Sequence, residues 1–322
     1  MLRCVSIDMG KYATKGAVYP PYNGEDRVYF KTHVDVGRML SNNGLINTNN
    51  SHTVFYNGTG YLVGASASGT DIETDNKGTA THIIAAYTAI GLLTDPGDEV
   101  IVAIGCPLSF FKNKDAVVQF KKTVFPALGR YDIVVDGRQK SFNVVKVQVC
   151  PESSGPIFLN PEKYQEMSVG VIDIGGLNSN GCRYDEGYPI LKSAFTNSFG
   201  GYSLINDLYN KIKEALSSKG HSNIEKDQLE RDVRQGFCLV DKDLTRPIIQ
   251  KAKEDAVNIL LKETSTNHWG VDNMYVTFIG GTARLLKPEI MNAFPHVVED
   301  CFSQDMDFIN ALGFLRLIKG MM

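Results

Sequence analysis

Three glycine turns in this sequence carry residues that can bind phosphate. The first turn, residues 8–15, reads DMGKYATK and follows an apolar run that is typical of a buried strand. Because glycine has no Cβ, the N–H groups around Gly10 can approach an anion closely. Asp8 can hold a Mg²⁺ ion through water, and Lys15 returns on the next strand as a point charge. Taken alone, the pattern also fits a hairpin whose aspartate and lysine are simply solvated.

The second turn contains two adjacent glycines directly after a strand-like apolar run. Asp173 comes first, Gly175 and Gly176 follow, and Leu177 and Asn178 come next. Adjacent glycines are poor strand formers and suit a backbone that comes close to a ligand. A glycine-rich turn without a ligand is the alternative interpretation.

The third turn ends a buried-type strand, VTFI at residues 276–279, with Gly280 and Gly281. Thr282 follows at a predicted helix start, where its hydroxyl is available as a cap. The N–H donors of a helix start and a flat glycine surface suit the sugar, purine or phosphate of a nucleotide. The chain contains neither G-x-G-x-x-G nor G-x-x-x-x-G-K-[ST]. Dinucleotide sites and P-loop sites therefore lose support.

Strands must position these turns, and the strand patterns restart halfway along the chain. In each half an apolar strand leads into an acidic glycine turn and a second strand, and helical patterns follow. Asp8 and Asp173 are 165 residues apart in a chain of 322 residues. A duplicated α/β unit with a cleft between its halves is the simplest architecture with this pattern.

Periodicity and turn signals predict the elements around these turns. Tight hairpins are expected at Asn57-Gly58 and at Asp136-Gly137, and a buried strand over residues 99–104. In one predicted helix, apolar residues recur at four-residue spacing and predict one buried stripe. These residues are Leu204, Leu208, Ile212 and Leu216. The predicted helices cover residues 79–93, 113–128, 201–216, 225–235, 247–262 and 308–318.

The composition is that of a globular protein with little net charge. Hydrophobic residues make up 43% and charged residues 21%, which excludes a wholly disordered chain. The length suits two domains of about 150 residues. A formal net charge of −3 argues against a broad electrostatic surface for nucleic acid. We therefore expect no direct nucleic-acid binding, and DNA would be reached through a partner.

The spacing of the cysteines and the length of the apolar runs indicate in which cellular compartment the protein is expected. Six cysteines are scattered without a C-x-x-C pair, so we expect free thiols in a reducing compartment instead of a zinc site or disulfides. The first residues lead directly into a strand pattern without a signal-peptide core, and no apolar run approaches about 18 residues. We expect a cytoplasmic protein that does not span a membrane.

Taken together, the three turns resemble those of the actin-type ATPase superfamily, which includes actins, sugar kinases and the heat-shock chaperone ATPase domain. Residues 8–15 look like its first phosphate motif, residues 173–180 its second and residues 280–282 its adenosine motif. Residues 150–155 and 308–314 resemble its first and second connecting helices. The resemblance covers nearly the whole chain.

This resemblance implies a duplicated actin-like (ribonuclease H-like) α/β fold with two domains around a nucleotide cleft. Domain I would comprise residues 1–158 and the C-terminal helix 303–322, and domain II residues 159–302. ATP, or GTP, would bind there with Mg²⁺ near Asp8 and Asp173. The nucleotide-binding residues implied are Asp8, Gly10, Lys11, Tyr12, Lys15, Asp173, Gly175, Gly176, Leu177, Asn178, Gly280, Gly281 and Thr282.

Glu152 is the catalytic residue that the resemblance implies. It would lie at the first connecting helix and face the γ-phosphate, where a carboxylate can polarise water for in-line attack. The alternative is a glutamate at a helix N-terminus after Pro151, which stabilises the helix dipole. The second motif departs from the superfamily, because Leu177, Asn178 and Asn180 stand where hydroxyl residues and a further aspartate are usual. The metal shell therefore has one acidic group fewer.

Within the superfamily, the compact length and the runs at residues 104–107 and 151–153 look like those of ParM-like plasmid-segregation actins. The resemblance implies an ATPase that forms polar head-to-tail filaments and drives plasmid DNA segregation. A ParR-like DNA-binding adaptor would link the filament to a centromere-like site. The alternatives are a small-molecule kinase, although no distinctive sugar-binding signature is present, and a non-polymerising chaperone or cell-division ATPase.

Overall fold

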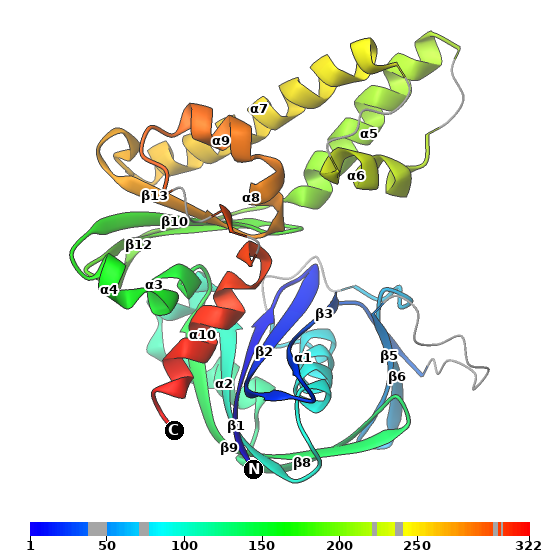
Figure 1. Cartoon of the computed structure of the whole chain (residues 1–322), viewed down its shortest axis with the longest axis vertical. Helices are drawn as coiled ribbons and strands as arrows, with labels where there is room; N and C mark the ends of the chain where they lie inside the picture. The colour runs from blue at the N-terminus through cyan, green and yellow to red at the C-terminus, as the bar shows by residue number, and fades with distance from the viewer. Residues whose placement is uncertain (38–49, 71–76, 221–223, 236–240, 299–301, 304) are drawn as a thin grey trace. The chain divides into compact units, whose positions relative to one another are not determined.

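The computed structural model describes residues 1–37, 50–70, 77–220, 224–235, 241–298, 302–303 and 305–322. These residues form two compact units. Unit 1 comprises Met1–Met167, Asp185–Leu191 and Asp307–Met322, and unit 2 comprises Ser168–Tyr184 and Lys192–Met306. The described strands form a nine-stranded and a four-stranded sheet, with helices packed on both, so the predicted α/β class is confirmed (Figure 1).

Three neighbouring parallel strands form the centre of the nine-stranded sheet. They are β1 (Leu2–Met9), β7 (Asp98–Cys106) and β9 (Arg138–Pro151). Ile7 pairs with Ile104 and Gly105 with Cys150, so the carboxyl ends of the three strands meet at one edge. The full order is β3-β2-β1-β7-β9-β8-β5-β6-β4. The other strands are β2 (Ala13–Tyr22), β3 (Glu25–Lys31), β4 (Val34–Val36), β5 (Ser51–Tyr56), β6 (Thr59–Gly64) and β8 (Gly129–Val135).

Two helices cover opposite faces of this sheet (Figure 1). Alternate residues of a strand point to opposite faces. Ile7 and its neighbours on that face pack with α1 (Ala80–Leu92), while Cys4 packs with α10 (Ile309–Lys319). Both helices were predicted from sequence. The short helices of unit 1 are η1 (Leu108–Lys112), α3 (Gly155–Leu159) and α4 (Pro161–Tyr164), and η4 (Met306–Phe308) leads into α10.

The two predicted hairpins form, but one helix ends early. Asn57-Gly58 and Asp136-Gly137 all have positive φ, as a tight hairpin turn requires. The helix predicted over residues 113–128 is α2 (Lys114–Val124). It stops there because the residue before Pro126 is disfavoured in helical conformation. Asn113 caps its start by accepting a hydrogen bond from the Asp115 amide at 2.9 Å.

The sheet of unit 2 repeats the strand order of the first sheet. Its order β12-β11-β10-β13 matches β3-β2-β1-β7, since three consecutive strands are followed by a crossover to a parallel neighbour of the first. This repeat supports the predicted duplication. The strands are β10 (Ser168–Ile174), β11 (Ser179–Asp185), β12 (Tyr188–Asn197) and β13 (Tyr275–Ile279).

The helices of unit 2 include one that is longer than predicted. The helix expected from Pro247 is α7 (Lys242–Thr266), which begins five residues earlier. Asp241 fixes that start, because its side chain accepts a hydrogen bond from the Leu244 amide at 3.2 Å. The predicted apolar stripe of α5 (Gly201–Ser218) is buried. The other helices are α6 (Lys226–Arg234), η2 (Val271–Asn273), α8 (Gly281–Leu285) and α9 (Lys287–Ala293).

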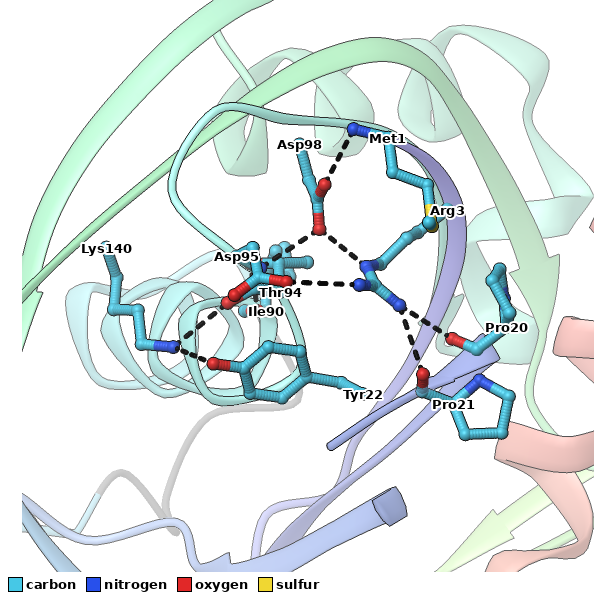
Figure 2. A network of polar contacts seen from close by, with 10 residues as sticks. All are labelled: Met1, Arg3, Pro20, Pro21, Tyr22, Ile90, Thr94, Asp95, Asp98 and Lys140. Carbon is cyan, nitrogen blue, oxygen red and sulfur yellow. Dashed lines mark hydrogen bonds and ion pairs between the residues drawn. The ribbon is translucent and has the colours of Figure 1, made fainter. Parts of the chain in front are cut away.

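A buried polar network holds the start of β1 to the start of β7 (Figure 2). Arg3 Nε donates to Asp98 Oδ2 at 2.5 Å, and the Met1 amino group donates to Asp98 Oδ1 at 2.8 Å. Arg3 also donates to the carbonyls of Pro20 and Pro21 at 3.0 and 3.2 Å. The network therefore joins β1, β2 and β7 by side chains as well as by backbone pairing.

Four cysteines lie within the described residues, namely Cys4, Cys106, Cys150 and Cys182, and all are buried free thiols. Cys238 and Cys301 lie outside the described residues. No helix in the described part of the chain is long and apolar enough to cross a membrane.

Candidate functional site

The first turn connects β1 to β2 and is held in a tight conformation. Asp8 pairs with Lys15 in the strand ladder, and its Oδ2 lies 3.6 Å from the Lys15 Nζ. A Cβ at Gly10 would lie 2.5 Å from the Ala13 carbonyl oxygen, so only glycine fits this turn. The Thr32 hydroxyl donates to the Gly10 carbonyl at 2.6 Å. Asp8 is buried, and the turn is fixed by its neighbours.

Lys11 and Tyr12 complete this turn and are half-buried. The Tyr12 carbonyl accepts a hydrogen bond from the Thr32 amide at 3.0 Å. The Lys31 Nζ lies 5.5 Å from the centre of the Tyr12 ring. Three cationic side chains, those of Lys11, Lys15 and Lys31, therefore belong to the first turn and its flanking strands.

Glu152 follows directly after β9 and is buried, with 3% of its surface exposed. Its amide donates to the Cys106 carbonyl at 2.9 Å, which ties it to the end of β7. Its Oε1 forms a direct ion pair with the Nζ of Lys77, which is 4% exposed. Because α3 begins only at Gly155, the interpretation of Glu152 as a residue at a helix N-terminus is wrong. The helix expected within residues 150–155 starts at the last of them.

Gly105 brings the carboxylates of Asp8 and Glu152 close together. A Cβ at Gly105 would lie 3.7 Å from Asp8 Oδ1 and 3.8 Å from Glu152 Cγ. Both acids therefore lie at the carboxyl ends of β1, β7 and β9. In open α/β sheets, ligands bind outside the carboxyl ends of the strands.

Two ionisable groups at this edge, Glu152 and Cys106, have shifted pKa values. Burial raises the pKa of Glu152 above its usual value, Lys77 and Lys11 oppose this rise, and Asp8 adds to it. Burial and the nearby Glu152 also raise the pKa of the Cys106 thiol. Such perturbed groups gather at functional sites. Burial thus favours the protonated form of Glu152, whereas the two lysines favour its carboxylate.

The backbone around Glu152 is supported from α10. Ser153 has a φ of 64°, a left-handed conformation that is uncommon outside glycine and is often found beside functional groups. The Gly155 amide donates to Asn310 Oδ1 at 3.2 Å. A Cβ at Gly313 would lie 2.1 Å from the Gly155 carbonyl oxygen. The two segments that resemble connecting helices thus contact each other within unit 1.

The second turn is fixed against the start of α5 in unit 2. The Gly175 amide donates to the Asn178 carbonyl at 2.9 Å. The carbonyls of Gly175 and Gly176 accept from the amides of Gly201 and Tyr202 at 3.0 and 2.7 Å. The backbone of Gly200, just before α5, lies against the backbone of Leu177. A Cβ at Gly200 would lie 2.7 Å from the Leu177 carbonyl carbon.

The third turn packs directly onto the second. Gly280 has a φ of 89°, and a Cβ there would lie 2.4 Å from the Ile174 carbonyl oxygen and 2.7 Å from Asp173 Oδ1. The Thr282 hydroxyl donates to the Gly175 carbonyl at 2.9 Å. Thr282 is therefore not a helix cap, contrary to the prediction. Gly281 is the first residue of α8, and the Thr282 hydroxyl bonds to the neighbouring turn instead.

The two units share one arrangement: a glycine at the carboxyl end of the neighbouring parallel strand lies beside the aspartate that is next to last in the first strand. Gly105 lies beside Asp8 in unit 1, and Gly280 lies beside Asp173 in unit 2. The residues predicted around each aspartate are thus gathered within their own unit. Sequence reasoning missed Lys77, which lies in a stretch without helical or strand periodicity. It noted Gly105 only within the run at residues 104–107.

The carboxylates of the described residues suit a hydrated Mg²⁺ ion better than a metal ion whose ligands all come from protein side chains. Among the described residues there is no group of three or more His, Cys, Asp or Glu side chains that could hold a metal ion. Mg²⁺ usually keeps several waters and binds through one or two carboxylates and phosphate oxygens. Each unit has one such carboxylate near the end of its first strand, namely Asp8 in unit 1 and Asp173 in unit 2.

Comparison with known proteins confirms the resemblance to actin-like proteins. Residues 6–155 match the family of actin like proteins, N terminal domain. No curated protein matches the sequence. Among solved structures, the archaeal actin homologue Ta0583 matches with a TM-score of 0.78 at 19% identity, over 99% of this chain and 100% of that chain. Its complex with ADP matches with a TM-score of 0.73 at 18% identity, over 98% and 99%.

Two filament structures match over equally long stretches. The Alp12 filament structure has a TM-score of 0.73 at 23% identity, over 99% of both chains. A 15-stranded ParM filament from Clostridium botulinum has a TM-score of 0.68 at 21% identity, again over 99% of both chains. The chain therefore has the actin-like fold over its whole length.

Proposed function

We propose that this protein is an ATPase that assembles into filaments and drives plasmid DNA segregation in the cytoplasm. The observation that carries the proposal is the pair of buried carboxylates, Asp8 and Glu152, at the carboxyl ends of β1, β7 and β9 of an actin-like fold. The filament structures of Alp12 and ParM and the ADP complex of Ta0583 support it. Residues 1–158 with 303–322, and residues 159–302, are the proposed domains.

Each turn has a separate role in this proposal. The first turn, with Asp8, Gly10, Lys11, Tyr12 and Lys15, binds the terminal phosphates. The second turn, residues 173–178, contacts the phosphates through its glycine backbone. The third turn, residues 280–282, contacts the adenosine. ATP is the proposed nucleotide, and GTP is the alternative, so binding and hydrolysis are measured with both.

Glu152 is the proposed catalytic residue. Its carboxylate would accept a hydrogen bond from the attacking water and orient it for in-line attack on the γ-phosphate. Mg²⁺ bound near Asp8 and Asp173 would neutralise charge on the phosphate oxygens. The raised pKa of Glu152 makes its carboxylate a stronger base than that of an exposed glutamate.

The proposed partners are further copies of this chain and a DNA-binding adaptor. Open polar filaments require head-to-tail contacts between unlike surfaces of identical subunits. A ParR-like adaptor bound to a centromere-like plasmid site would link the filament to DNA, in line with the net charge of −3. No direct contact with nucleic acid or membrane is proposed.

Light scattering of the purified protein with Mg²⁺ tests the proposal. Assembly is expected with ATP and loss of assembly as phosphate is released, because a ligand shifts a conformational equilibrium only through its differential affinity for the two states. Equal critical concentrations with ATP, with ADP and without nucleotide would contradict nucleotide-dependent assembly. ADP formation that needs an added small-molecule acceptor, with the γ-phosphoryl group transferred to that acceptor and no phosphate released, would favour a kinase instead.

A matched pair of glycine variants tests the phosphate turns. Gly175→Val places a branched side chain where a Cβ alone would lie 3.1 Å from the Asn178 carbonyl oxygen. We expect loss of ATP binding by calorimetry, with helicity retained. Gly270→Val is the control, since a Cβ there meets open space, and it is expected to bind ATP like the wild type. Wild-type affinity in Gly175→Val would remove the second turn from the site.

A further inference from the structure

We propose that Lys77 is a positioning residue for Glu152, which holds its carboxylate in place and balances its charge in the buried edge of unit 1. This inference rests on the proposed function, in which Glu152 orients the attacking water. It adds a residue that lies outside all three glycine turns and both connecting segments.

The contact is direct and buried on both sides. The Lys77 Nζ forms its ion pair with Glu152 Oε1, and the two residues are 75 positions apart in the sequence. The exposed fractions of their side chains are 5% and 4%. By contrast, the Lys15 Nζ lies 3.6 Å from Asp8 Oδ2. The Lys77–Glu152 pair is thus in closer contact than the Lys15–Asp8 pair.

The surroundings of Glu152 explain why a cation is needed there. Isolated ionised groups are costly to bury, and removing one partner of a buried pair leaves the other uncompensated. The second acid of this edge, Asp8, lies nearby, and the backbone of Gly105 and Cys106 closes one side. An ammonium group in contact with Oε1 offsets this cost and restricts rotation of the carboxylate. A carboxylate that is held in one orientation is what water activation requires.

The position of Lys77 in the chain adds to the argument. It lies just before α1, whose buried residues pack on the sheet that carries Asp8. The packed helix therefore anchors the segment from which the Lys77 side chain reaches Glu152. Glu152 itself is held by the hydrogen bond that its amide N–H donates to the Cys106 carbonyl. Both partners are fixed independently, so the ion pair has a defined geometry.

Three substitutions at Lys77 separate charge from packing. Lys77→Met removes the charge and keeps the length, Lys77→Gln keeps an N–H donor without charge, and Lys77→Arg keeps the charge. Single-turnover hydrolysis at saturating ATP and Mg²⁺ is measured beside ATP affinity. We expect Lys77→Met to lose on the order of 10²-fold in rate, within the range of a misplaced base, at nearly unchanged affinity. Lys77→Arg should restore most of the rate, and Lys77→Gln should fall between the two.

A second background shows whether Lys77 acts through Glu152. In Glu152→Gln, the further change Lys77→Met should not lower the rate again, since residues that act as one unit are not additive. If Lys77→Met alone does not fold, the comparison of Lys77→Gln with Lys77→Arg decides the question. The double variant should melt at a higher temperature than Lys77→Met, because it buries no unpaired charge.

The contrary outcomes are distinct from one another. Weaker ATP binding by Lys77→Met in both backgrounds would mean that Lys77 contacts the nucleotide and would overturn the proposal. An unchanged rate per folded molecule in a less stable Lys77→Met would overturn it as well. Arg3→Met, which breaks another buried ion pair of unit 1, is the matched control and should keep the wild-type rate. Absence of hydrolysis by the wild type would instead overturn the proposed function.

Discussion

Buried charged groups lie at both ends of the central parallel strands β1, β7 and β9, and the two clusters are bonded differently. At the strand starts, Arg3 contacts Asp98, Asp95 and two carbonyls, and Asp98 also accepts from the Met1 amino group (Figure 2). At the carboxyl ends, Asp8 and Glu152 lie near each other with Lys15 and Lys77 beside them. The same strands thus hold two charged clusters with different surroundings.

The pKa shifts of the two clusters have opposite signs. Burial raises the pKa of Asp98, but hydrogen bonds from the Met1 amino group, Arg3 and the Asp95 amide lower it more, so it lies below its usual value. Burial dominates at Glu152, whose pKa is raised despite Lys77. A saturated buried carboxylate stabilises a fold, whereas a less compensated one is available for chemistry. Burial of charge alone therefore does not identify a functional site.

Breaking the cluster at the strand starts should have the largest effect on stability. Arg3→Met leaves Asp98 buried without one of its cationic partners, and breaking such a pair typically costs about 3–5 kcal/mol. The free energy of unfolding is measured with denaturant, and ATP hydrolysis is measured per folded molecule. We expect a large loss of stability with unchanged hydrolysis. A loss of hydrolysis at unchanged stability would reverse the roles of the two clusters.

The pH dependence of stability should follow Asp98. Its unfolded pKa is about 4, and its folded pKa is lower. Its contribution to stability is therefore present above the unfolded pKa and is lost as the pH falls through the folded pKa. Denaturant unfolding of the wild type and of Asp98→Asn at a series of acidic pH values checks this. Asp98→Asn should show a weaker decrease in the acid range, and equal slopes would rule out Asp98 as the source.

An exposed ion pair should show the smallest effect. Lys211 and Asp207 on α5 are one helical turn apart, with Nζ 2.7 Å from Oδ2 and nearly half of each side chain exposed. Exposed pairs of this spacing contribute about 0.3–0.5 kcal/mol. Lys211→Met should change the free energy of unfolding by no more than this, and should leave hydrolysis unchanged. A loss comparable to that of Arg3→Met would show that burial is not what separates these pairs.

Local patterns in the sequence predict the fold well. Glycine-containing hairpins, the buried strand at β7 and the apolar stripe of α5 depend on neighbouring residues, and these predictions are confirmed. The end of α2 and the start of α7 depend on single residues that override the helical periodicity. Pro126 ends α2 early, and the Asp241 cap starts α7 early. Periodicity alone misplaces such ends.

The site is only partly predictable from the sequence. The three turns are visible because glycine and aspartate follow apolar strands, and the resemblance adds Glu152. The Lys77–Glu152 and Arg3–Asp98 pairs join residues 75 and 95 positions apart, so no local pattern reveals them. Only the parallel register of β1, β7 and β9 brings these groups to the two ends of one sheet.

The most direct test of the account is phosphate release by Glu152→Gln with saturating ATP and Mg²⁺. This variant keeps the size of the side chain and removes its ability to accept a proton. The account predicts a rate about 10²–10⁴-fold below that of the wild type, with ATP binding retained and filaments that persist because hydrolysis is slow. Normal phosphate release from a stably folded Glu152→Gln protein would contradict the assignment of chemistry to the carboxyl ends of β1, β7 and β9.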